Sequence, residues 1–186
     1  VLVLSGIGKV AAATTTALLL DRFAADAVLF TGVAGGLGPG VAVGDVVIGD
    51  DLLQHDLDAS PIFPRWEVPL TGKSHFAADA RWSDALARAA VGCGHAVHRG
   101  LIVSGDRFVS TAAESAALCT LLPDALAVEM EGAAVAQVCH DFGRPFAVMR
   151  TVSDRADDSA HIDFARFVAE VAAGLTRRIV REALRG

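Results

Sequence analysis

The sequence predicts an α/β protein built as a three-layer α/β/α sandwich. Segments typical of strands alternate along the chain with segments typical of helices. Several of the strand-like segments, such as L-I-V at 101–103 and F-A-V-M at 146–149, are continuous apolar runs. Runs of this kind are typical of strands covered by helices on both faces, and helices on both faces of a sheet make three layers.

The first half of the chain begins with the pattern of a βαβ unit. The apolar run V-L-V-L at 1–4 predicts a strand, the Ala-, Thr- and Leu-rich segment at 9–23 a helix, and A-V-L-F-T at 27–31 a second strand. A Gly-rich stretch at 32–44 predicts a loop, and the segment 45–55 a third strand. Three prolines between 56 and 72 exclude a regular helix there, so we expect a loop and a candidate lid.

The second half repeats the alternation. Helices are expected near 79–91, 112–122, 132–142 and 164–184, and strands at 99–104, 125–130 and 146–153. No linker, repeat or low-complexity tract interrupts these elements, so we expect residues 1–186 to form a single domain. The chain opens at Val1 inside a strand-like run with no initiator Met, and we expect it to begin partway through that domain, with an N-terminal strand missing.

The amino-acid composition restricts the kinds of binding partner and the cellular compartment that we expect for this protein. Hydrophobic residues make up 53% of the chain and charged residues 20%, which predicts a core and further apolar surface for an oligomer. The net charge of −6 argues against nucleic acid, and the run 1–20 lacks a basic leader and is broken by Gly6, Gly8 and Lys9, so no membrane partner is expected. Three cysteines, an odd number, predict free thiols in a reducing cytoplasm.

Carboxyl-bearing side chains stand at the ends of two predicted strands. Ser153 and Asp154 follow one strand, and Glu129 and Glu131 end another just before a helix of small residues. We expect these two strand ends to form one acid–base site. A carboxyl group partly removed from water at position 154 is expected to have a raised pKa and to carry a proton at neutral pH. The alternatives are a helix or turn cap for Asp154 and a solvated edge for the glutamates.

Two Gly-rich segments admit more than one interpretation. Gly6 and Gly8 imitate a dinucleotide fingerprint, but the second strand ends in Thr31 and Gly32 rather than in the acidic residue that the ribose needs. A tight turn that lets the backbone approach a substrate, or a purely structural turn, fits better. The second segment, T-G-V-A-G-G at 31–36, predicts either backbone amides that line a small polar group or a tight loop without a ligand.

Two clusters invite a metal interpretation that we do not adopt. Cys93, His95 and His98 lack a fourth ligand close by in sequence. His55 next to Asp56 is at least as typical of a hydrogen-bonded pair at a strand end. We therefore expect no metal.

A set of motifs stands in a fixed order over nearly the whole chain. The motifs are S-G-I-G-K-V-A-A-A at 5–13, T-G-V-A-G-G at 31–36, V-G-D-V-V at 43–47, H-D at 55–56, R-G-L-I-V-S-G-D-R-F-V at 99–109, A-V-E-M-E at 127–131 and V-S-D at 152–154. With these motifs the chain resembles the methylthioadenosine/S-adenosylhomocysteine nucleosidases of the purine nucleoside phosphorylase superfamily. The resemblance implies a twisted mixed central sheet flanked by helices, a homodimer, and hydrolysis of the N-ribosidic bond of a 5′-modified adenosine to release adenine, with no cofactor.

The resemblance also implies roles for individual residues near the base and the sugar. Asp154, with Ser153 beside it, is similar to the acid that protonates or hydrogen-bonds N7 of the purine. Met130 and Glu131 resemble the ribose contacts, with Glu131 holding the sugar hydroxyls. Arg150 is similar to the arginine near the nucleophilic water.

Further positions resemble the walls of the pocket. Phe108 and Val109 are similar to residues that stack on the base and contact it through the backbone. Ile7, Phe164 and the loop of the partner subunit near Phe63 and Pro69 resemble the apolar pocket for the 5′-alkylthio tail. Val33 stands where the family often has a hydroxyl residue that contacts the water.

Cleavage of such a bond needs a proton on the leaving group and an activated water on the other face of the sugar. The resemblance places the water-activating glutamate on a strand that precedes Val1, and this sequence does not contain it. Two alternatives to the hydrolase therefore stay open. One is a purine nucleoside phosphorylase, and the other is an inactive nucleoside-binding form that lacks the catalytic glutamate.

Overall fold

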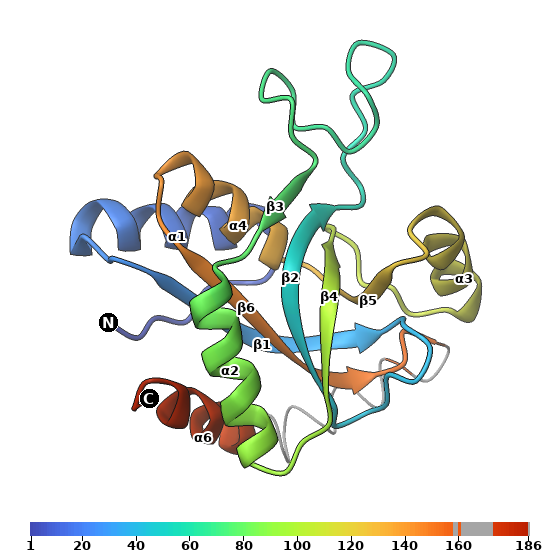
Figure 1. Ribbon diagram of the computed structural model, residues 1–186. Helices are drawn as coiled ribbons and strands as arrows, with labels where there is room; N and C mark the ends of the chain where they lie inside the picture. Colours follow the sequence, from blue (N-terminus) through green and yellow to red (C-terminus); the bar gives the residue numbers. More distant parts are fainter. Residues whose placement is uncertain (158–159, 161–172, 186) are drawn as a thin grey trace.

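The computed structural model describes residues 1–157, 160 and 173–185, which alternate between strands and helices (Figure 1). The alternation follows the predicted order closely. The described elements are α1 (Lys9–Phe23), β1 (Val28–Gly36), β2 (Val46–Gln54), β3 (His75–Ala77), α2 (Ala80–Gly92), β4 (Val97–Ser104), α3 (Ala112–Leu121), β5 (Ala125–Glu129), α4 (Gly132–Asp141), β6 (Phe146–Asp154) and α6 (Ala173–Ala183).

The sheet is mixed and closes on itself. Its order is β3-β2-β4-β5-β1-β6, and β2 also pairs with β6. Three pairs are parallel (β1–β6, β2–β4 and β4–β5) and three are antiparallel (β1–β5, β2–β3 and β2–β6). The predicted α/β fold with a central mixed sheet is confirmed. The sheet is not a flat middle layer, however, because strand twist and register shifts at 34/35 and 49/51 bend it until β2 meets β6.

Helices cover the outside of this curled sheet in separate groups. Helix α1 lies against α4, α2 lies against α6, and α3 stands apart beside β5 (Figure 1). The first group belongs to one buried cluster with β1 and β2, and the second group to another with β2 and β6. All nine residues of β6 are buried, which explains why the strand begins with the continuous apolar run F-A-V-M at 146–149.

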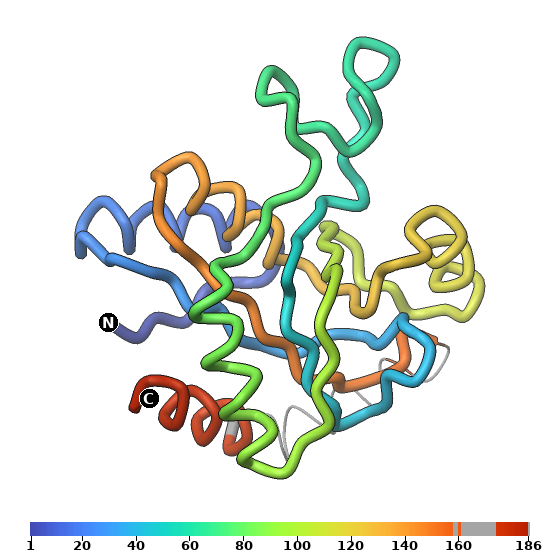
Figure 2. Tube along the Cα trace, viewed as in Figure 1, coloured from blue at the N-terminus to red at the C-terminus, as the bar shows by residue number. Residues whose placement is uncertain are grey.

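The Pro-containing excursion is an irregular segment between β2 and β3. It projects from the body of the molecule as two loops above β2 (Figure 2). Its Ile62 and Leu70 side chains are exposed, whereas the indole N–H of Trp66 donates to the carbonyl oxygen of His55 at 3.1 Å. The absence of regular helix at 56–72 is confirmed.

Three expectations about elements need correction. Residues 1–4 form no strand, because no described strand pairs with them, and Leu2 is 99% exposed. The segment 31–36 is not a loop but the second half of β1, since it pairs with β5 and β6. The short strand β3 was not predicted. The helix expected at 164–184 is described only from Ala173 onward as α6, so Phe164 lies outside the described residues.

The cysteines are free thiols, as predicted. Cys139 is fully buried on α4, and burial raises the pKa of its thiol to about 12. Cys93 and Cys119 are partly exposed. Among the described residues, no helix is long and apolar enough to cross a membrane.

We predict that Cys139 does not react with a thiol-specific disulfide reagent in the native protein. At pH 8 a thiol with a pKa of about 12 is ionised to roughly one part in ten thousand, and only the thiolate reacts. Absorbance titration should count two thiols, Cys93 and Cys119, in buffer and a third, Cys139, only after denaturant is added. A Cys139→Ala variant should lose only this third thiol, and rapid native labelling of Cys139 contradicts the prediction.

Candidate active site

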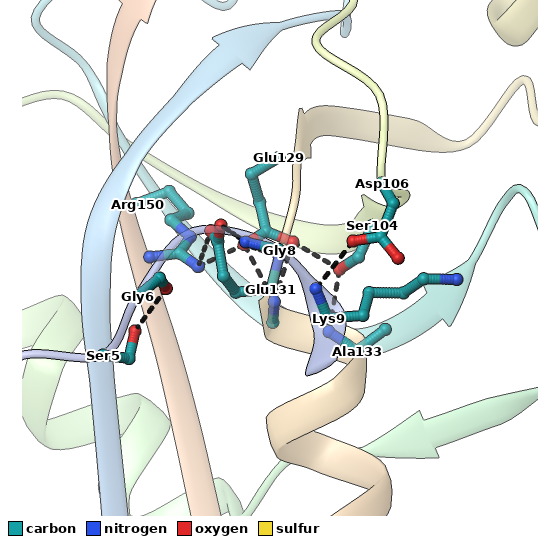
Figure 3. A network of polar contacts seen from close by, with 11 residues as sticks. Ser5, Gly6, Gly8, Lys9, Ser104, Asp106, Glu129, Glu131, Ala133 and Arg150 are labelled. Carbon is teal, nitrogen blue, oxygen red and sulfur yellow. Dashed lines mark hydrogen bonds and ion pairs between the residues drawn. The ribbon is translucent and has the colours of Figure 1, made fainter. Parts of the chain in front are cut away.

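A buried ion pair lies at the centre of the site. The side chain of Arg150, on β6, is 2% exposed, and its Nη2 donates to Oε2 of Glu129 at the end of β5. The same nitrogen lies 3.7 Å from Oε2 of Glu131. Figure 3 shows the three side chains converging from β5, β6 and the start of α4. The two glutamates singled out from the sequence therefore lie close to the same arginine.

The Glu129 carboxylate is saturated with donors. It accepts the backbone N–H of Gly132 at 2.8 and 2.9 Å, the N–H of Glu131 at 3.1 Å, and the hydroxyl of Ser104. The Ser104 oxygen in turn accepts the N–H of Ala133 at 2.7 Å. These N–H groups are the free donors at the start of α4, where a negative charge is favoured. Glu129 is thus fixed as a structural anion.

Arg150 lies flat across β1 because the sequence leaves room for it. A Cβ on Gly32 is expected only 2.2 Å from Nη1 of Arg150, so no side chain fits at that position. The guanidinium carbon lies 4.3 Å from the ring centroid of Phe30, within cation–π range. Arg150 Nε is buried without a hydrogen-bond partner among the described residues.

Glu131 is the more accessible of the two glutamates. It caps the start of α4, and its Oε1 accepts the backbone N–H of Gly8 at 2.8 Å. Burial raises the pKa of Glu131, and the charge of Glu129 raises it further, while the Gly8 N–H and Arg150 act in the opposite direction. The net pKa lies above the ordinary glutamate value. Glu131 therefore has a carboxylate that is held on one side and can accept hydrogen bonds from hydroxyl groups.

Asp154 ends β6 as a buried carboxyl group, 2% exposed. Its Oδ1 accepts the N–H of Ala156 at 2.8 Å, and its Oδ2 lies 2.8 Å from the Ser153 hydroxyl. A Cβ on Gly35 is expected 3.0 Å from Oδ1 and 2.8 Å from the Cβ of Ala156. The T-G-V-A-G-G motif thus has a physical explanation: its glycines let the Arg150 and Asp154 side chains approach β1.

Strand β1 brings the two predicted strand ends together. Gly35 is paired with Asp154 of β6 on one side and with Val128 of β5 on the other. Because β5 runs antiparallel to β1, the chain after Glu129 returns alongside β1 toward Gly32, where β6 places Arg150. Gly32, opposite Arg150, and Gly35, opposite Asp154, are three residues apart on β1, which corresponds to roughly 10 Å along a strand. The Glu131–Arg150 pair and Asp154 therefore lie along the same stretch of β1, separated by about that distance.

The other predicted site residues differ in their surroundings. Val109 is buried in a cluster with Val103 and Val128, and its neighbour Phe108 is 41% exposed. Met130, between the two glutamates, is partly exposed, and Ser153 is fully buried beside Asp154.

Three further predicted positions lie at the periphery or within the sheet. Val33 is part of β1, paired with Thr151. Ile7, just before α1, is 78% exposed. Phe63 lies in the irregular excursion between β2 and β3 rather than in the sheet.

Sequence reasoning missed four residues that hold the site. Gly8 and Lys9 contact Glu131 and Asp106 through their backbone N–H groups, and Ser104 contacts Glu129. The signal was present in the S-G-D sequence at 104–106, directly after an apolar strand, and in the turn at Gly8. The signal could not be interpreted alone, since the partners lie 25, 97 and 123 residues away in sequence.

The residues weighed as metal ligands have other roles. His98 Nε2 lies 2.8 Å from Asp45 Oδ2, which joins β4 to the start of β2. Asp56 accepts a hydrogen bond from Lys9 Nζ at 2.7 Å. Among residues 1–157, 160 and 173–185, no three His, Cys, Asp or Glu side chains are grouped as a metal site needs. The Gly6–Gly8 turn lies against Glu131, so no dinucleotide site is indicated there.

The structure thus combines a mixed sheet, carboxyl groups and an arginine gathered at its strand ends, and a glycine turn that contacts one of these carboxylates. The sequence model of the phosphorylase superfamily matches residues 1–185. The chain belongs to this superfamily and, within it, to the 5′-methylthioadenosine/S-adenosylhomocysteine nucleosidase family.

Three relatives support this assignment. The nucleosidase of Anoxybacillus flavithermus is 42% identical over 174 residues, which are 92% of this chain and 75% of the relative. The crystal structure of the Neisseria meningitidis nucleosidase in complex with methylthio-immucillin-A has a TM-score of 0.92 at 46% identity, over 97% of this chain and 78% of that one. The Streptococcus pyogenes S-adenosylhomocysteine nucleosidase in complex with 5-methylthiotubericidin has a TM-score of 0.90 at 35% identity, over 97% and 76%.

We predict that Arg150→Met destabilises the protein by about 3–5 kcal/mol, because it leaves the buried Glu129 carboxylate without its cation. Urea denaturation measures this change. Arg99→Met is the matched control: Arg99 pairs with Asp50 and Asp84 at the surface, so its loss should cost less than about 1 kcal/mol. The double variant Glu129→Gln/Arg150→Met should regain part of the loss. Equal small effects of the two arginine variants contradict the prediction.

Proposed function

We propose that this protein hydrolyses the N-ribosidic bond of 5′-methylthioadenosine and S-adenosylhomocysteine and releases adenine. One observation carries the proposal. A buried carboxyl group at position 154 and a partly buried carboxylate at position 131 lie along the same stretch of β1. A nucleoside has a base at one end and sugar hydroxyls at the other. The two groups match these two ends.

Asp154 is the group proposed for the leaving base. Cleavage of the bond leaves negative charge on the purine, and a proton or a hydrogen bond at N7 stabilises that charge. The Asp154 carboxyl group is 2% exposed, so a contact between it and a bound base is shielded from water. Ser153 and the Ala156 N–H fix the orientation of the carboxyl group.

Glu131 is the group proposed for the sugar. Its Oε1 is held by Gly8 N–H, so the carboxylate has a defined orientation toward hydroxyl donors. Met130, beside it, supplies an apolar contact for the sugar ring. Arg150, which lies 3.7 Å from Glu131, is proposed to lie near the attacking water.

The base and the 5′ tail are proposed to contact more peripheral residues. Phe108 and Val109 are placed against the base, and Val33 lies on β1 opposite Thr151, which stands between Arg150 and Asp154 along β6. Ile7 and Phe63 of the partner subunit are placed around the alkylthio tail, together with Phe164. This assignment requires a homodimer, and the exposed apolar side chains of the projecting excursion support one.

Water rather than phosphate is the proposed acceptor. Arg150 is already bound by Glu129 and lies close to Glu131, so its positive charge is neutralised and is not free to hold a phosphate. A cytoplasmic role in methionine salvage fits the free thiols and the proposed substrates.

We predict that the protein releases adenine from methylthioadenosine at a rate that does not depend on phosphate concentration. Chromatography of the reaction mixture, with and without added inorganic phosphate, measures adenine and the sugar product. Formation of a sugar 1-phosphate at a rate proportional to phosphate favours the phosphorylase alternative. Calorimetric binding of methylthioadenosine without any product favours the binding-only alternative.

We predict that Asp154→Asn lowers the rate of adenine release by about 10²–10⁴-fold, because the amide cannot pass a proton to the base. The shape of the side chain is preserved, so circular dichroism and thermal unfolding should show a folded protein. Asp124→Asn, at an exposed position before β5, is the control and should keep full activity. Unchanged release by Asp154→Asn removes this residue from the mechanism.

A further inference from the structure

A second polar cluster lies next to Glu131 and joins three parts of the chain. It consists of Lys9 at the start of α1, Asp56 after β2 and Asp106 after β4. The Lys9 N–H donates to Asp106 Oδ1 at 2.7 Å, the Asp106 N–H donates to Asp56 Oδ2 at 2.9 Å, and Lys9 Nζ donates to Asp56 Oδ1 at 2.7 Å. The three bonds form a closed loop, so each residue is held by the other two.

This loop fixes the turn that contacts Glu131. Gly8, directly before Lys9, donates its N–H to Glu131 and has a φ of +93°, in the left-handed region. A Cβ on Gly8 is expected 3.0 Å from Asp106 Oδ1. Figure 3 shows the Gly8–Lys9 turn held between Glu131 on one side and Asp106 on the other. The position of the Gly8 N–H therefore depends on Asp106.

The start of α1 has no cap of its own, which explains why the cluster is needed. Gly8 has no side chain to accept the first N–H groups of the helix. Asp106 accepts the Lys9 N–H in its place, and Glu131 accepts the Gly8 N–H. Negative charge at a helix N-terminus is favoured, so both carboxylates are stabilised where they stand.

The charges of the cluster are fixed near neutral pH. Burial acts to raise the pKa of Asp56, but the bonds from Lys9 and from the Asp106 N–H bring it below the ordinary aspartate value. Burial lowers the pKa of the neighbouring His55, so Lys9 is the cation that pairs with Asp56.

We propose that Asp106, held by Asp56 and Lys9, is a positioning residue for the reaction: it clamps the Gly8 turn so that the Gly8 N–H orients the Glu131 carboxylate toward the sugar hydroxyls. The inference rests on the proposed function, because it assigns Glu131 to the sugar. Asp106 itself touches neither the substrate nor the reacting atoms. It acts through Gly8 and Glu131.

The test compares Asp106→Ala in two backgrounds. Loss of the clamp should lower kcat/KM for methylthioadenosine about ten- to hundredfold, as a misplaced binding group does. In a Glu131→Gln background the same change should cause no further loss, since the two residues act as one unit. Asp106 is exposed, so Asp106→Ala should stay folded, and Asp124→Ala is the matched control for removal of an exposed carboxylate.

The pH profile separates positioning from a general loss of structure. Glu131 must be ionised to accept hydrogen bonds from hydroxyl groups. Burial and the charge of Glu129 raise the pKa of Glu131, whereas the hydrogen bond from the Gly8 N–H and the charge of Arg150 lower it. Without the clamp, the acidic limb of kcat/KM should move to higher pH. Asp106→Asn keeps an oxygen acceptor for the Lys9 N–H, so it should restore most of the activity and the wild-type limb.

Each result has a defined meaning. Equal losses from Asp106→Ala in the wild-type and Glu131→Gln backgrounds, an unmoved acidic limb, or unchanged kcat/KM overturns the inference. If the wild-type protein releases no adenine, or Glu131→Gln keeps full activity, it is the proposed function that fails. An active wild type, an impaired Glu131→Gln and an unaffected Asp106→Ala reject the positioning role alone.

Discussion

The buried contact between Arg150 and Glu129 is the constraint on which the site depends. Two charges removed from water are costly unless every donor and acceptor around them is used. Here the start of α4, the Ser104 hydroxyl and Phe30 surround the pair, so β4, β5, β6 and α4 can close only in one arrangement. Glu131 follows two residues after Glu129, and its position is a consequence of this arrangement.

Glycine makes the same arrangement possible on β1. Gly32 leaves space for the Arg150 guanidinium, and Gly35 leaves space for the Asp154 carboxyl group. A side chain at either position forces one of the two functional groups away from the strand. The glycines of the T-G-V-A-G-G motif therefore act through the side chains of β6, and not through loop flexibility or backbone amides.

The site has an inner and an outer support. On the inside, backbone N–H groups of α4 hold Glu129, and Glu129 holds Arg150. On the outside, the turn at Gly8 contacts Glu131 from the start of α1. Glu129 and Glu131, separated by one residue in sequence, thus have different surroundings. This difference explains why Glu129 is a structural anion and Glu131 is available to a ligand.

The sequence by itself determined the order of elements, most of their bounds, and the two strand ends at Glu129–Glu131 and Ser153–Asp154, because apolar periodicity and local strand-end patterns are properties of neighbouring residues. Its ordered motifs also determined the family. Only the tertiary structure decided that β2 pairs with β6, that residues 31–36 belong to a strand, that Arg150 and Gly8 contact the glutamates, and that Asp106 holds the N–H of Lys9. These are contacts between residues far apart in the chain, and the choice among many such pairings is made by packing and by the need to satisfy buried charges.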